Sequence, residues 1–227
     1  QAGTLAKKYE KFALKWADTI TVSSKEMVDY YKTKGYDVIL IPNALDVENL
    51  PKEEDRRFEK QIIFAARLSK EKGIIDVLEM SKKLPQDIHL VILGDGPEIT
   101  KVKKIESTAS NIHYFGPKSK EETIQLIRGS DILIQPSLME GGISYTLLES
   151  LTCKTPVICT SVGGGKEFFN HLKNCYLIEP GDQKDMLDGI IKLMTDSKIY
   201  QNLVEHGYDS VQKFSWKNII ESILSIN

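Results

Sequence analysis

The chain has 227 residues, of which 41% are hydrophobic and 27% are charged, and its formal net charge at pH 7 is -2. Such a composition is typical of a globular protein with a sizeable core. The near-neutral charge argues against a nucleic-acid-binding protein, which usually carries a basic stripe. No apolar run reaches the roughly 18 residues that a membrane-spanning helix needs, which leaves only a peripheral membrane contact open.

The cysteines and histidines argue against a disulfide framework and a metal site. Cys153, Cys159 and Cys175 are odd in number and show no C-x-x-C spacing. We therefore expect buried, reduced thiols. Reduced thiols are typical of the cytoplasm, so we expect the protein there or at the cytoplasmic face of the membrane. The four histidines are well separated and offer no metal-ligand spacing, so we expect no metal. The chain also has no GxGxxG or Walker A motif, and we expect no cofactor.

Short β-branched runs alternate along the chain with amphipathic stretches. Strands are expected at residues 19–23, 38–41, 61–65, 89–93, 112–115, 132–135, 156–159 and 176–178. Helices are expected between them, for example at residues 73–83, 120–128, 144–151 and 182–194. Several strands are apolar throughout, as in a sheet covered on both faces. The pattern predicts an α/β fold, a doubly wound parallel sheet with helices on both faces.

The chain divides into three segments, residues 1–42, 43–60 and 61–227. The middle one contains Pro51 and a charge-dense run at residues 52–57, which indicates either an interdomain linker or a solvated helical turn. Residues 1–42 are too few to bury a core of their own. The chain also begins Gln1-Ala2-Gly3, without an initiator Met or a signal-like stretch, which indicates a piece of a longer protein.

Ligands of a doubly wound sheet bind beyond the carboxyl ends of its strands, and two of the loops there carry cations or glycines. Arg67 and Lys72 follow the strand at 61–65 and lead into a helix. They would form a diphosphate cradle or a solvated basic turn. Gly94 and Gly96 follow the next strand, where they permit close backbone approach or only a tight turn.

Two further loops combine glycines with carboxylates. Glu140 lies in the glycine-rich loop after residues 132–135, and Glu149 lies in the helix that follows. Such a loop can direct amides at an anion, and a carboxylate can bind paired hydroxyls of a sugar or ribose. The run Gly163-Gly164-Gly165 comes after the seventh strand and indicates either a close-approaching backbone or a flexible loop.

Taken in order, these pieces resemble the C-terminal domain of GT-B glycosyltransferases of the glycogen-synthase and bacterial mannosyltransferase kind. The resemblance runs from about Ala17 to the end of the chain. It rests on Ala17-Asp18-Thr19-Ile20, Pro42-Asn43-Ala44-Leu45-Asp46, Ala66-Arg67-Leu68 with Lys72-Gly73, Gly94-Asp95-Gly96-Pro97, Phe115-Gly116, Ser130-Asp131 with Pro136-Ser137, Gly163-Gly164 with Glu167, and Phe214-Ser215-Trp216.

The resemblance implies a retaining, metal-independent transfer of sugar from a UDP- or GDP-linked donor to a hydroxyl of a glycan, lipid or other small compound. It makes Arg67, Lys72 and Glu140 the catalytic residues and Glu149 the ligand of the ribose hydroxyls. The family spaces its two carboxylates by seven residues, whereas eight separate Glu140 from Glu149. Either the loop has one extra residue or Gly141 takes the first position. The remaining donor-binding residues would be Gly94, Gly96, Phe115, Gly141, Gly142, Ile143, Ser144, Gly163 and Gly164.

By the same resemblance, residues 1–42 are the tail of an N-terminal acceptor domain, 43–60 the interdomain linker and 61–227 the nucleotide-sugar-binding domain with its C-terminal helices. Most of the acceptor domain would then lie outside this chain. Two alternatives stay open: a non-catalytic nucleotide-sugar-binding module, and a nucleotide-sugar 2-epimerase, which the Arg67-Leu68 and Lys72-Gly73 segment fits less well.

Overall fold

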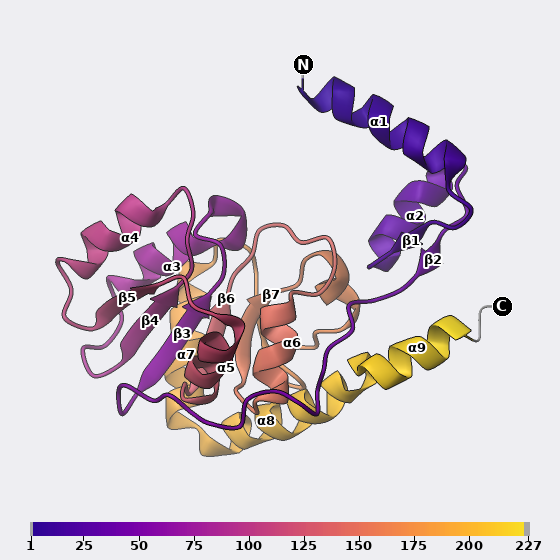
Figure 1. Cartoon of the computed structure of the whole chain (residues 1–227). Helices are drawn as coiled ribbons and strands as arrows, with labels where there is room; N and C mark the ends of the chain where they lie inside the picture. The colour runs from indigo at the N-terminus through magenta and orange to yellow at the C-terminus, as the bar shows by residue number, and fades with distance from the viewer. Residues whose placement is uncertain (1, 225–227) are drawn as a thin grey trace.

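The computed structural model describes the backbone of residues 2–224 and the side chains of residues 9–224. Gln1 and residues 225–227, which the first and last sequence-based segments include, lie outside the described residues. Residues 61–224 form the larger body, and residues 2–42 form a smaller α/β piece beside it (Figure 1).

The body is built on a six-stranded sheet in which all neighbouring strands are parallel, in the order β5-β4-β3-β6-β7-β8. From β3 the chain adds strands outward on one side, then returns to β6 beside β3 and adds strands on the other side. This order confirms the predicted doubly wound sheet. The strands are β3 (Gln61–Ala65), β4 (His89–Leu93), β5 (Ile112–Gly116), β6 (Ile132–Gln135), β7 (Val157–Thr160) and β8 (Tyr176–Ile178).

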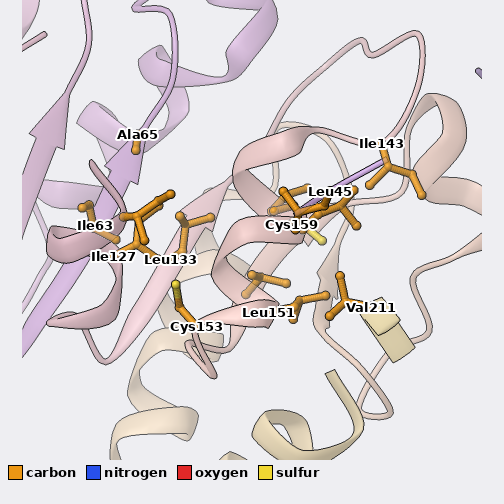
Figure 2. Packing of buried hydrophobic residues seen from close by; sticks show 14 of the residues in the cluster. Leu45, Ile63, Ala65, Ile127, Leu133, Ile143, Leu151, Cys153, Cys159 and Val211 are labelled. Carbon is orange, nitrogen blue, oxygen red and sulfur yellow. The ribbon is translucent and has the colours of Figure 1, made fainter. Parts of the chain in front are cut away.

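Helices cover both faces of this sheet because successive strand residues point to opposite sides. Ile63 and Leu133 join one apolar cluster with Ile127 of α5 and the apolar side of α6 (Figure 2). Ile62 and Phe64 join the other cluster, with α3, α4, α7 and α8. The helices are α3 (Ile74–Ser81), α4 (Ile99–Glu106), α5 (Lys120–Arg128), α6 (Tyr145–Thr152), α7 (Gln183–Thr195), α8 (Ser197–Val211) and α9 (Trp216–Leu224).

Three short 3-10 helices complete the body: η1 (Lys70–Lys72), η2 (Gly163–Glu167) and η3 (Gln212–Phe214). The helix predicted at 73–83 begins one residue later, because Gly73 has a φ of +76° and closes η1 instead. The helix predicted at 120–128 has those bounds, since Ser119 and Glu122 form a capping box at its start.

Residues 2–42 form α1 (Ala2–Trp16), β1 (Thr21–Val22), α2 (Lys25–Thr33) and β2 (Ile39–Leu40), with β1 and β2 paired in parallel. On α1, Tyr9, Phe12 and Trp16 recur at helical spacing and are at least 65% exposed. The smaller piece contacts the body where α2 meets η2. There Glu167 Oε1 accepts from Lys25 N at 3.1 Å, so these two residues set one point of attachment.

Within the described chain, residues 43–60 contain no helix, so the helical-turn interpretation is wrong. They run along the body (Figure 1). Leu45 and Leu50 are buried in its core, and Leu45 N donates to Phe214 O at 2.7 Å. Farther along, Arg56 makes a two-bond ion pair with Asp131, with distances of 2.7 and 3.2 Å.

The expected buried, unpaired cysteines are confirmed. Burial raises the pKa of the Cys153 thiol to about 11.

Among the described residues, no helix has both the length and the apolar character to cross a membrane.

Candidate functional site

The candidate site lies where the strand order reverses, between the loops that follow β3 and β6. These loops touch through their backbones: a Cβ on Gly73 would lie 2.0 Å from Pro136 O. In addition, Leu138 N donates to Glu71 O at 2.8 Å. The contact places residues 67–72 directly beside residues 137–140, at the position where doubly wound sheets bind their ligands.

A carboxylate and a cation meet across this junction. Glu140 Oε1 lies 2.6 Å from Lys72 Nζ, 2.8 Å from Ser137 Oγ and 3.2 Å from Gln135 Nε2. The Glu140 side chain is 14% exposed and the Lys72 side chain 28%. Gly141, by contrast, is exposed and faces open space. This arrangement favours the interpretation in which the loop has one extra residue and Glu140 supplies the first carboxylate.

Gln135 and Ser137 orient Glu140. The sequence analysis missed Gln135, and it named Ser137 only within the run Pro136-Ser137, without a role at the site. Gln135 is 2% exposed, and its position at the end of the otherwise apolar strand β6 was the available signal. Its Oε1 also accepts from Ser144 Oγ at 3.1 Å. Ser144 occupies the N-cap position of α6, but this hydroxyl does not cap the helix. Gln135 therefore links the Glu140 loop to the first turn of α6.

The glycine-rich loop after β6 and the triple glycine after β7 pack against each other, backbone to backbone. Gly163 has a φ of +52°, and a Cβ there would lie 2.2 Å from Glu140 O. A Cβ on Gly164 would lie 3.0 Å from Gly142 C and Ile143 N. The triple glycine therefore forms η2 and a close backbone approach rather than a flexible loop, and Ile143 is buried beneath it.

Arg67 lines a neighbouring pocket of about 220 Å³, together with Gly94, Asp95, Pro117 and Lys118. Gly94 has a φ of +121°, and a Cβ there would lie 2.0 Å from Ala66 O. A Cβ on Gly96 would lie 2.5 Å from Leu68 O. Arg67 is exposed, and its positive charge helps to lower the pKa of the nearby Glu71 carboxyl, after hydrogen bonds from the Glu71 backbone and from Ser69.

Glu149 lies on α6 and is 8% exposed. Its carboxylate lies 3.6 Å from Lys120 Nζ at the start of α5, two residues beyond Lys118 of the Arg67 pocket. Burial raises the pKa of the Glu149 carboxyl, and the Lys120 charge opposes this rise. Lys120 carries no sequence signal, since it is one of many exposed lysines.

Phe115 lies near the Gly94 loop through its backbone, since Gly94 N donates to Gly116 O at 3.0 Å, but its side chain does not line the pocket at that loop. It lies within β5, and its side chain packs against the core, with its ring centroid 6.5 Å from that of His113. No group of three or more His, Cys, Asp or Glu residues in the described part of the chain could hold a metal ion.

Comparisons with known proteins identify the family. Residues 46–210 match the family of glycosyl transferases group 1. An uncharacterized glycosyltransferase of Methanocaldococcus jannaschii is 24% identical over 233 residues, which cover 95% of this chain and 59% of that protein. The N-acetyl-alpha-D-glucosaminyl L-malate synthase of Bacillus anthracis is 28% identical over 177 residues, covering 74% of this chain and 45% of that protein.

Solved structures show the same fold. The Anabaena protein HepE, in complex with UDP-glucose, superposes with a TM-score of 0.83 at 16% identity, covering 95% of this chain and 65% of that one. The likeness confirms the fold expected from the resemblance to GT-B glycosyltransferases. The chain spans about half the length of the curated relatives it matches. Its matched residues, its fold and its relatives place it in the glycosyl transferases group 1 family.

Proposed function

We propose that this chain is the donor-binding part of a retaining glycosyltransferase, which moves a sugar from a nucleoside diphosphate sugar to an acceptor hydroxyl. The observation that carries the proposal is the ion pair of Lys72 and Glu140 where the strand order reverses, with the exposed Arg67 on the same loop as Lys72. Cationic side chains form charge-assisted hydrogen bonds with a diphosphate. A carboxylate beside them can accept hydrogen bonds from the hydroxyls of the sugar.

In this proposal, Arg67 and Lys72 neutralise the charge that develops on the departing diphosphate. Lys72 shares its three N–H donors between Glu140 and a phosphate oxygen. Amides of residues 141–144 and of η2 supply further donors, and no divalent metal or cofactor takes part. The leaving phosphate accepts the acceptor proton, and Glu140 binds the donor sugar.

Glu149 is proposed to accept hydrogen bonds from both ribose hydroxyls. The carboxylate is nearly buried, and Lys120 offsets its desolvation only in part. A buried carboxylate that raises the free energy of the folded chain is often retained for a binding role. The nucleotide would then extend from the Arg67 pocket, beside β4 and β5, toward Glu140.

The rest of the enzyme is proposed to pack against the apolar side chains that this chain leaves exposed. On α1 these are Tyr9, Phe12 and Trp16, and on α9 they are Trp216, Ile220, Ile223 and Leu224. Such stripes usually mark an interaction surface. The acceptor, a glycan, a lipid or another small hydroxyl compound, would bind mainly on that remaining part. A transfer assay on the whole protein distinguishes this enzyme from a module that only binds the nucleotide sugar.

The first prediction concerns the cations. Arg67→Ala and Lys72→Ala should each weaken UDP or GDP binding roughly 10- to 100-fold, because each removes a charge-assisted hydrogen bond to the diphosphate. Calorimetric affinities for UDP and uridine measure the effect, with Arg57→Ala as the control, since Arg57 is exposed and pairs with Asp55 in the linker. Equal losses for UDP and uridine would contradict a diphosphate role.

A second prediction concerns Glu149 and stability. Its folded-state pKa lies above its ordinary value, so its ionisation destabilises the fold as pH rises through that pKa. Glu149→Gln should therefore raise the melting temperature at pH 7, by an amount that shrinks toward pH 4, while it weakens binding of every nucleotide tested.

The matched control is Glu122→Gln in the capping box. Hydrogen bonds from Ser119 lower the pKa of Glu122, so its contribution stabilises the fold above its ordinary pKa and is lost in acid. This variant should melt lower at pH 7 and leave nucleotide affinity unchanged. A Glu149→Gln variant that melts lower at pH 7 and binds UDP like the wild type would refute the proposed role.

A third prediction concerns metal. Donor binding and turnover should survive thorough treatment with EDTA, because Arg67 and Lys72 supply the positive charge at the diphosphate. The measurement compares transfer rates of the whole protein before and after chelation and after Mn²⁺ or Mg²⁺ is restored. A rate that EDTA abolishes and metal restores would show that these side chains do not suffice.

A further inference from the structure

One hydrogen bond joins the segment after β2 to the candidate donor site. Asn43 Nδ2 donates to Ile143 O at 2.7 Å, across a separation of 100 residues. Ile143 is buried, and Ser144, the next residue, precedes the first turn of α6. The Asn43 amide therefore fixes the orientation of the peptide group between the Glu140 loop and the helix that carries Glu149.

The same loop is in contact on two sides. On one side, a Cβ on Gly142 would lie 2.9 Å from Ser23 Oγ and 3.5 Å from Asn43 Nδ2. On the other side, the backbone of Gly163 and Gly164 approaches Glu140, Gly142 and Ile143. Residues 140–144, here called the donor loop, are thus held between η2 and the ends of β1 and β2.

We propose that Asn43 is a positioning residue, which holds the donor loop in the conformation that receives the diphosphate and ties that conformation to the smaller piece of the chain. The inference rests on the proposed function, since it takes the donor loop to face the nucleotide sugar. Asn43 itself does not touch the donor; it acts through the Ile143 carbonyl.

Both contacts of the donor loop on this side come from residues 2–42 or from the segment that directly follows them. Ser23 follows β1 directly and Asn43 follows β2, so a displacement of residues 2–42 acts on both contacts with the donor loop at once. The same piece is also attached to η2, because Glu167 accepts from Lys25 N at 3.1 Å, and Gly163 and Gly164 of η2 contact the other side of the loop. Donor affinity therefore depends on where residues 2–42 sit against the body.

The test uses this 227-residue chain, with Asn43→Ala against Asn49→Ala. Asn49 is an exposed amide in the same segment, and its side chain bonds only the Asp46 carboxylate among the described residues. Two quantities are measured: amide hydrogen exchange of every segment by mass spectrometry, and calorimetric affinity for UDP and for uridine.

Asn43→Ala should speed exchange of residues 141–148 selectively and weaken UDP binding about 3- to 10-fold, as expected for the loss of one hydrogen bond. Uridine affinity should stay within a factor of about two, because the diphosphate is the part that meets the donor loop. Asn49→Ala should match the wild type in both measurements.

Unchanged exchange at residues 141–148, or equal losses for UDP and uridine, would overturn the positioning role. Faster exchange throughout the sheet would also overturn it, because Asn43 would then only stabilise the fold. A wild-type chain that binds neither UDP nor GDP would refute the proposed function instead. The exchange result would still decide whether Asn43 holds the loop.

Discussion

The site depends on one constraint, the backbone contact between the loops that follow β3 and β6. Parallel strands end at the same edge of the sheet, and the reversal of strand order between β3 and β6 leaves a crevice there that no crossover helix fills. The backbones of Gly73 and Pro136 are in close contact there. The contact is possible only without a side chain at Gly73, and it brings Lys72 within 2.6 Å of Glu140.

The charged side chains around this contact differ in how far their neighbours compensate them. Glu140 Oε1 accepts hydrogen bonds from Lys72, Ser137 and Gln135, so these groups orient the carboxylate before any ligand binds. Glu149 is less well compensated, since the mostly exposed Lys120 is 3.6 Å away. Arg67 is exposed and lines the neighbouring pocket. A diphosphate would pair with the Arg67 cation, and ribose hydroxyls would donate hydrogen bonds to the Glu149 carboxylate. Incompletely compensated charges of this kind are common at binding sites.

The sheet and its helices could be predicted from the sequence because apolar strand residues and capping signals are local. Glycine positions such as Gly94 and Gly163 also carried a signal, since their positive φ values and close backbone contacts exclude other residues. Contacts between distant segments could not be predicted. Gln135 could be suspected from its apolar strand. Lys120 beside Glu149 does not differ in sequence from an exposed lysine. Asn43 belongs to a run that carries the family resemblance, but that run does not predict its contact with Ile143.

The most direct test of the central claim is a crystal structure of this chain with a bound nucleoside diphosphate sugar. The account predicts phosphate oxygens within hydrogen-bonding distance of Arg67, Lys72 and amides of the donor loop, with the ribose hydroxyls on Glu149 and the sugar beside Glu140. A nucleotide bound elsewhere, or one bound with Arg67 and Lys72 both disengaged from its phosphates, would contradict it.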